Sequence, residues 1–193
     1  MRKLFLVMMC SALLFGCTSK ARNNDVNAAN TAYAGYYKAI DDNSRFQSDS
    51  LYYDVEAEMI RMSDGTYRYY ITIDNPQIAM YYISVLAVAD HVPYENANAM
   101  MPSIGIYESE KYHMIPFQTN ANTGYVKGLV ISGESDHENI PIQMLVEWYD
   151  RTRENQRREF LEFEMNLSGI VVPEDSFVVE ETEQPVEEET ENE

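Results

Sequence analysis

The fold of this chain is decided by residues 53–73, which read YDVEAEMIRMSDGTYRYYITI. On both sides of Ser63-Asp64-Gly65, apolar and polar side chains alternate with a period of two, the pattern of a β-strand with one buried face. A two-residue loop would place Glu58 opposite Ile71 and turn one apolar set outward. A three-residue loop, with Gly65 in the left-handed conformation, keeps both sets on one face. We therefore predict a bulged hairpin that pairs Met59 with Tyr69, Ala57 with Ile71 and Val55 with Ile73.

The chain after this hairpin continues as strands. From Ile78 to Ala89, most odd-numbered and most even-numbered positions are apolar. Because alternate residues face opposite sides of a strand, this predicts a central strand covered on both faces. Short strands are expected at Ile104–Tyr107 and, because of Pro116, at a sheet edge for Tyr112–Phe117. A further strand from Tyr125 to Ser132 is expected to stop at Gly133-Glu134-Ser135.

A last hairpin is predicted around a polar tip from Asp150 to Gln156. Its inward side chains are expected to be Ile142, Met144, Val146 and Trp148 on one strand and Leu161, Phe163, Met165 and Leu167 on the other. Six to eight strands with little helix predict an all-β fold, an immunoglobulin-like antiparallel β-sandwich at residues 45–172.

The segments on either side of this domain differ from it. Thr18 to about Asn27 is small and polar, which favours a flexible tether. Ala29, Tyr33, Tyr36, Tyr37 and Ile40 form the stripe of a short amphipathic helix, so residues 17–44 are predicted to be a tether with a short helix. Residues 173–193 are acidic with almost nothing to bury, and we expect a disordered tail.

The first residues resemble a known targeting signal. Arg2 and Lys3 precede a 12-residue uncharged run, too short to cross a bilayer as a helix, and this run ends at Leu14-Phe15-Gly16-Cys17. That sequence resembles the lipobox of bacterial lipoproteins, in which the chain is cut before a cysteine that then carries lipid. Phe15 departs from the pattern, because a smaller residue is usual there. The strands also loosely resemble the immunoglobulin-like domains of other bacterial lipoproteins.

The resemblance implies a place in the cell. Residues 1–16 would be a signal peptide and Cys17 the lipidated residue, so the domain would be membrane-anchored through its N-terminal lipid and face outside the cytoplasm, on the outer membrane if the cell has two membranes. Cys10 would leave with the signal peptide. The mature chain would then have no disulfide and no thiolate metal site.

The charge of the chain limits its partners. The formal net charge is -18, and residues 174–193 hold ten Asp or Glu and no Lys or Arg. A field of this sign repels phosphate backbones, so we predict a protein or cell-wall partner and no nucleic acid.

No catalytic or metal constellation is evident in the sequence, and we predict no cofactor. His91, His113 and His137 lack the spacing of metal ligands. Ser135, Asp136 and His137 are too close in the chain for a catalytic triad, whose members converge from distant segments. Asp54, Glu56 and Glu58 are expected to be a solvated strand face. The alternatives are a calcium site or part of a glycosidase pair, for which Glu56 and Glu58 are the candidates.

Two features are candidates for binding. The irregular stretch from Asp90 to Ser103 is long enough to be functional or loose, and Tyr94, Met100 and Met101 are its contact residues. A basic cluster in the last hairpin is the second: Arg151, Arg153, Arg157 and Arg158. Trp148 is expected in the core. Each of the pairs Tyr52-Tyr53, Tyr69-Tyr70 and Tyr81-Tyr82 would send one ring outward or under a second layer.

We therefore predict a non-catalytic binding or assembly module at the cell surface. Two other classes stay open. One is an envelope enzyme that acts on carbohydrate or peptide, and the other is a structural subunit of a secretion or transfer apparatus, which would show a large apolar patch.

Overall fold

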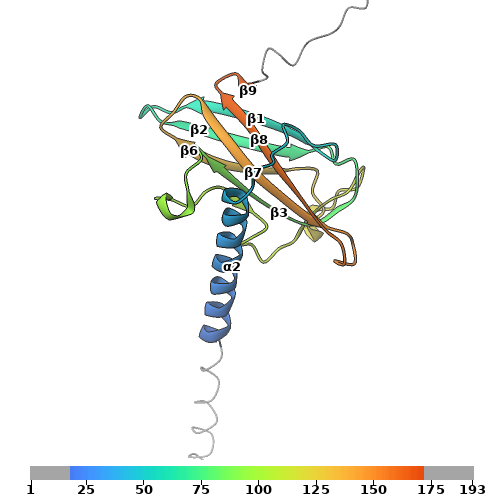
Figure 1. Ribbon diagram of the computed structural model, residues 1–193. Helices are drawn as coiled ribbons and strands as arrows, with labels where there is room; N and C mark the ends of the chain where they lie inside the picture. The colour runs from blue at the N-terminus through green and yellow to red at the C-terminus, as the bar shows by residue number, and fades with distance from the viewer. Residues whose placement is uncertain (1–17, 172–193) are drawn as a thin grey trace, which may run out of the picture.

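A computed structural model describes residues 18–171, and their side chains from residue 25 onward. The predicted signal peptide, Cys17 and the predicted acidic tail lie outside the described residues. Figure 1 shows two antiparallel sheets with one long helix, α2, beneath them. The elements are α2 Thr18–Asp41, β1 Asp54–Arg61, β2 Tyr67–Asp74, β3 Met80–Ala89, η2 Tyr94–Asn96, β4 Ser103–Ile104, β5 Tyr112–Met114, η3 Ala121–Thr123, β6 Leu129–Ser135, β7 Ile140–Tyr149, β8 Gln156–Asn166 and β9 Gly169–Val171.

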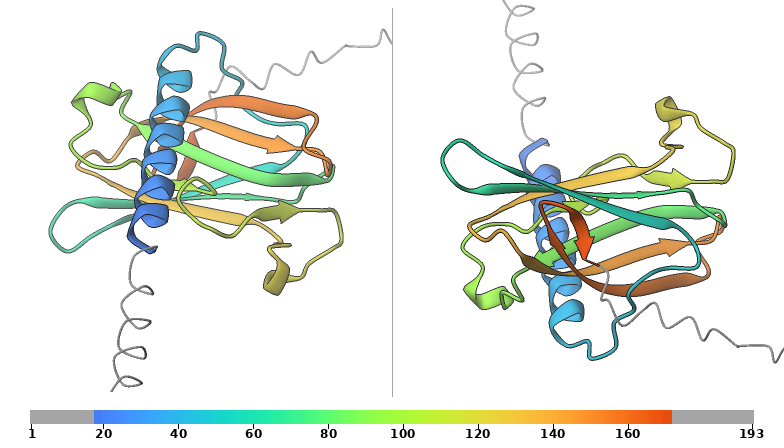
Figure 2. Two further views of the ribbon diagram at one scale, coloured as in Figure 1. Left: turned by 90° about the horizontal axis from the view of Figure 1, so that it is seen from below. Right: turned by 90° about the horizontal axis from the view of Figure 1, so that it is seen from above.

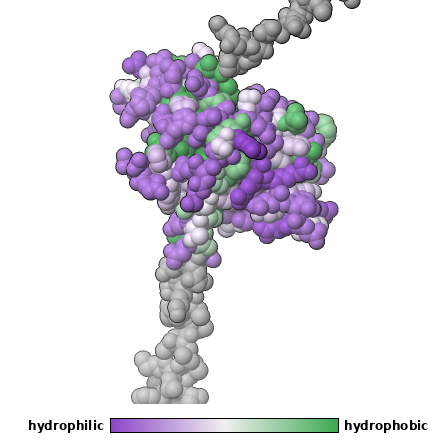
Figure 3. Space-filling view, viewed as in Figure 1, coloured by the Kyte–Doolittle hydropathy of each residue, from purple (hydrophilic) through white to green (hydrophobic). Residues whose placement is uncertain are grey.

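The sheets are arranged in two layers. The small sheet has the strand order β1-β2-β6, and the large sheet has the order β4-β3-β7-β8-β9, with β5 also paired to β3. Buried side chains from both sheets form one core between them, which includes Ile71, Val85 and Trp148. The two antiparallel sheets confirm the all-β prediction. The outer surface seen in Figure 3 is mostly hydrophilic with small apolar groups.

The first hairpin has the predicted register. Met59 pairs with Tyr69, Ala57 with Ile71 and Val55 with Ile73. The amide N–H of Met62 donates to the carbonyl of Thr66 at 2.8 Å, which closes a loop of Ser63, Asp64 and Gly65, and Gly65 has a φ of 92°. Glycine adopts this left-handed conformation at no steric cost, so the bulged three-residue loop is confirmed.

The central strand is β3, and it is covered on both faces as predicted. Val85 and Ala87 face the core between the sheets, whereas Leu86 and Val88 pack with Tyr33, Tyr37 and Ile40 of α2. Figure 2 shows the helix crossing the outer face of the large sheet in both views. The molecule therefore has three layers: α2, the large sheet and the small sheet.

The predicted inward side chains of the last hairpin are buried, with one exception. Trp148 is 2% exposed and belongs to the core as expected, but Leu167 is 45% exposed. Strand β8 ends at Asn166, so Leu167 lies in the turn before β9 and the alternation no longer fixes its direction. The expectation that Leu167 faces inward is wrong.

Two predicted boundaries are also wrong. The helix begins at Thr18, so residues 18–27 are helical and are not a flexible tether. This stretch contains no Gly or Pro, and adding a residue to an existing helix is far easier than starting one. Strand β6 runs through Gly133 to Ser135 and does not stop there, because Gly133 pairs with Tyr69, whose ring lies over it.

Candidate functional site

The candidate site is built by residues 90–103, which we call the long loop. With the end of β6, this loop encloses a hollow of about 710 Å³, the loop hollow, and Tyr69 of β2 and His137 also line it. A volume of this size is typical of ligand sites. The loop begins where β3 ends, at Asp90 and His91, whose φ angles are 58° and 50°. Non-glycine residues seldom adopt such angles, and backbone strain of this kind gathers at functional positions.

A small polar cluster lies in the loop hollow. The Ser135 hydroxyl donates to Asp90 Oδ2 at 3.3 Å and accepts from the His137 amide N–H at 3.0 Å. His137 Nδ1 lies 3.5 Å from Asp90 Oδ1. The carboxylate therefore lies between the serine and the imidazole. A triad places the imidazole between the other two, so this arrangement is not that of a triad. The cluster instead joins the long loop to β6.

The long loop is also bound to α2 by two buried tyrosines. The Tyr37 hydroxyl donates to the Val92 carbonyl at 2.7 Å, and the Met101 amide N–H donates to the Tyr33 hydroxyl at 2.8 Å. Burial raises the pKa of Tyr37 to about 12 and raises the pKa of Tyr33 as well. Both hydroxyls therefore keep their protons at neutral pH, and the loop has one fixed attachment near each end.

The predicted contact residues of the long loop lie together at its surface. Tyr94 is 42% exposed and Met100 is 63% exposed, whereas Met101 is half-buried. Met100 and Met101 line the loop hollow, and Tyr94 and Met100 line a second hollow on the α2 side. The structure therefore gathers these three side chains around one loop.

The four arginines of the last hairpin do not form one patch. The Arg153 guanidinium lies 4.3 Å from the ring centroid of Tyr82, and Arg157 Nη1 donates to the Tyr52 hydroxyl at 3.2 Å. Arg158 pairs with a buried carboxylate, and Arg151 is exposed. Arg157 and Arg158 are neighbours on β8 and so point to opposite faces. The sequence shows the charges but not the aromatic rings that separate them.

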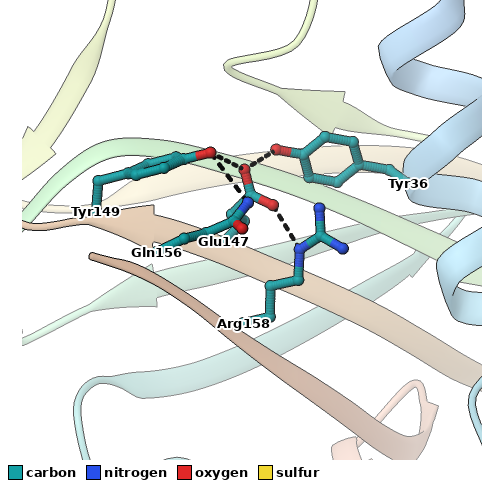
Figure 4. A network of polar contacts seen from close by, with 5 residues as sticks. All are labelled: Tyr36, Glu147, Tyr149, Gln156 and Arg158. Atoms are coloured by element: carbon teal, nitrogen blue, oxygen red, sulfur yellow. Dashed lines mark hydrogen bonds and ion pairs between the residues drawn. The ribbon is translucent and has the colours of Figure 1, made fainter. Parts of the chain in front are cut away.

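Sequence reasoning missed a polar network around one buried carboxylate, drawn in Figure 4. Glu147 of β7 has a side chain only 5% exposed, and Arg158 Nε donates to its Oε2 at 2.6 Å. Its Oε1 accepts from the hydroxyls of Tyr36, at 2.6 Å, and Tyr149, at 3.2 Å, and Gln156 in turn donates to Tyr149. Burial, followed by the contact with Glu147, raises the pKa of Tyr36. Because Glu147 is next to the inward-facing Trp148 on β7, alternation predicts that Glu147 faces water. In the structure α2 covers that face of the sheet. The apolar residues on both faces of β3 indicated such a covering layer.

The other polar candidates are separate from one another. Asp54, Glu56 and Glu58 are exposed on β1, as expected for a solvated face, and Glu56 and Glu58 line a hollow beside β9. His113 is buried and accepts a hydrogen bond from the Tyr82 amide near the start of β3, whereas His91 and the His137–Asp90 pair lie beyond the end of that strand. Among the side chains that the structure describes, residues 25–171, no three His, Cys, Asp or Glu form a group that could hold a metal ion.

Comparisons with known proteins add no family. No helix within the described part of the chain has the length and apolar character needed to span a membrane. No protein-family model, no curated protein and no solved structure matches this chain.

Proposed function

We propose that this chain is a lipid-anchored protein of the cell envelope whose sandwich domain is a non-catalytic binding or assembly module. The long loop is its contact element, and its partner is a protein or a cell-wall polymer. One observation carries the proposal. The loop presents exposed Tyr94 and Met100 beside a hollow of about 710 Å³ and is fixed to both α2 and β6. A surface held in place before binding loses less entropy when a partner docks.

The strand order supports an immunoglobulin-like classification of the domain. Immunoglobulin strands A, B and E lie in one sheet and C, F and G in the other. If β1, β2, β3, β6, β7 and β8 correspond to A, B, C, E, F and G, the pairings β1-β2-β6 and β3-β7-β8 follow this pattern.

The position of α2 supports the anchor. The lipobox-like stretch ends at Cys17, and α2 begins at the next residue. In Figure 1 the N-terminal half of α2 projects away from the sheets, while β9, where the described chain ends, lies at the opposite side. Lipid at Cys17 would therefore attach at the end of a projecting helix and leave the sheets clear of the bilayer surface.

The anchor is tested by the variant Cys17→Ser. We expect the native chain to fractionate with membranes and to carry acyl chains at Cys17 by mass spectrometry, and the variant to leave the membrane fraction. Because Cys17 lies outside the domain whose contacts the structure describes, the variant should have the same melting temperature as the native chain. An unmodified Cys17 in the native chain would refute the anchor.

The binding role is tested by site-specific photocrosslinking in intact cells. A photoreactive residue at Met100 should capture a defined partner, whereas the same residue at Val130, which is 55% exposed on β6, should not. A parallel variant that replaces Arg151, Arg153, Arg157 and Arg158 tests the basic hairpin. Equal capture from Met100 and Val130 would remove the long loop as the interface.

An envelope enzyme is the second candidate, favoured by the hollow of about 520 Å³ that Glu56 and Glu58 line. A general acid must keep its proton near neutral pH, which burial usually provides, yet both side chains are exposed. The geometry therefore supports binding better. Hydrolysis of an oligosaccharide or peptide that is lost in Glu56→Gln would favour the enzyme.

A further inference from the structure

Phe117 is a fully exposed aromatic residue in an unfavourable backbone conformation. Its φ is 61°, and its side chain is exposed throughout. It lies in the turn from Ile115 to Gln118, in which the Gln118 amide N–H donates to the Ile115 carbonyl at 3.1 Å. Pro116 at the second position and a positive φ at the third are the features of a type II turn, which favours Gly or Asn where this chain has Phe117.

Folding does not account for this residue. A non-glycine residue in the left-handed region costs of order 1 kcal/mol, and an exposed phenyl ring gains nothing from burial. Asparagine would fit the turn with less strain. An exposed ring in a strained turn is therefore a candidate contact for a ligand.

Phe117 lies at the rim of a shallow hollow of about 490 Å³, the aromatic hollow, whose lining carries no formal charge. Besides Phe117, its lining residues are Gln118, Thr119, Asn120, Thr123 and Tyr125. In a chain of net charge -18, an uncharged hollow of amides, hydroxyls and two aromatic rings is distinctive. Amides and hydroxyls both donate and accept hydrogen bonds, as sugar hydroxyls do, and an aromatic ring suits the C–H face of a pyranose.

The floor of the aromatic hollow is rigid. Asn120 and Tyr125 exchange backbone hydrogen bonds of 2.8 and 3.1 Å, and the Tyr125 ring centroid lies 4.9 Å from that of His113. Gly124 has a φ of 77°, and a Cβ there would collide with the Lys111 carbonyl. The His113 ring is itself fixed by the Tyr82 amide at 3.0 Å. The hollow thus needs little ordering to bind.

We propose that the aromatic hollow binds an uncharged oligosaccharide, with Phe117 and Tyr125 stacking on a sugar ring and the amides of Gln118 and Asn120 bonding its hydroxyls. This site is distinct from the long loop. Figure 2 shows η3, beside the aromatic hollow, and η2, in the long loop, at opposite ends of the sheets in both views. The site is therefore independent of the contact proposed for the long loop.

The proposal is tested by calorimetric titration of the full chain in a detergent that has no sugar headgroup. The probes are cellotetraose, maltotetraose and tetra-N-acetylchitotetraose, with tetragalacturonate as the charged comparison. We expect at least one neutral probe to bind, and Phe117→Asn to weaken it about tenfold or more. The melting temperature of Phe117→Asn should equal or exceed that of the native chain, because Asn relieves the turn. Gln118→Ala should also weaken binding.

Val130→Asn is the matched control, since it replaces an exposed apolar residue on the outer face of β6 and should leave affinity unchanged. Two results with the native chain would each overturn the proposal: no binding of any neutral probe at millimolar concentration, or tighter binding of tetragalacturonate than of the neutral probes. Native affinity in both Phe117→Asn and Gln118→Ala would also overturn it. So would a lower melting temperature for Phe117→Asn, because the ring would then have a role in folding.

Discussion

Glu147 shows at the scale of one residue how the helix and the sheet are joined. A buried carboxylate is unstable unless it is hydrogen-bonded, and Glu147 has partners on three elements: Tyr36 on α2, Tyr149 on β7 and Arg158 on β8. Strand β8 therefore contributes a charge to the attachment of α2. Arg158 is part of this network, whereas Arg151 is exposed and takes no part in it.

The two arginines make a matched test. We expect Arg158→Ala to lower the free energy of unfolding by about 1–2 kcal/mol, because it removes a charged hydrogen bond from a buried acceptor. Arg151→Ala should change it by less than about 0.5 kcal/mol. Urea denaturation of both variants measures the difference, and equal effects would mean that the network adds no stability.

His113 predicts a pH dependence at the same scale. Burial lowers the pKa of His113 below its ordinary 6.5, so the unfolded chain takes up this proton at a higher pH than the folded protein does. The contribution of His113 to stability is therefore complete above about pH 6.5 and decreases as the pH falls toward the folded pKa.

His113→Asn isolates this effect, because the Asn Oδ1 can still accept from the Tyr82 amide. Urea denaturation at about pH 7.5 and about pH 5 should show that the native chain loses more stability on acidification than the variant. The many carboxylates titrate in both chains and cancel in the comparison. Parallel losses would rule out His113 as a source of acid sensitivity.

At the scale of elements, the alternation of apolar and polar residues predicted the strand register within one hairpin. It failed where the structure depends on contacts with another element. The register of β1 and β2 followed from parity, because a shift of one residue would have exposed Ile71. The sequence pattern did not predict that β6 continues through Gly133, because this continuation depends on the Tyr69 ring of the neighbouring strand β2. The long loop was recognised by its length, whereas its attachment to α2 depends on tertiary contacts that no local pattern encodes.

Gly133 provides the test at this scale. A Cβ at Gly133 would collide with the Tyr69 ring and hydroxyl, so Gly133→Ala should destabilise the protein by about 1–3 kcal/mol. In a Tyr69→Ala background the cost should nearly vanish. Gly35→Ala is the control, because an added Cβ would have no atom within 4 Å beyond the adjacent backbone of its own helix. Ala favours a helix, so stability should rise by up to about 1 kcal/mol. Thermal unfolding of these variants measures how far the effect of Gly133→Ala depends on the Tyr69 ring. If Gly133→Ala destabilised the Tyr69→Ala background equally, the proposed collision would be refuted.

For the whole molecule, α2 connects the proposed anchor to the proposed contact surface. Its 24 residues correspond to about 36 Å of helix. The buried side chains Tyr33, Tyr37 and Ile40 lie in its C-terminal half, against the large sheet. The same two tyrosines bind the long loop, so the helix that would lead to the bilayer also fixes the loop that would meet a partner.

The double variant Tyr33→Phe and Tyr37→Phe removes both hydroxyls and keeps both rings in the core. The Val92 carbonyl and the Met101 amide then lose their partners, so we expect amide hydrogen exchange in the long loop to accelerate while exchange in β3 and β7 changes little. Crosslinking from Met100 should fall in parallel if a fixed loop is what the partner recognises. Tyr112→Phe is the control, because its hydroxyl makes no hydrogen bond to the described residues, and it should alter neither measurement. Faster exchange with unchanged crosslinking would separate the attachment of the loop from its recognition, and unchanged exchange would show that the two hydroxyls do not hold the loop.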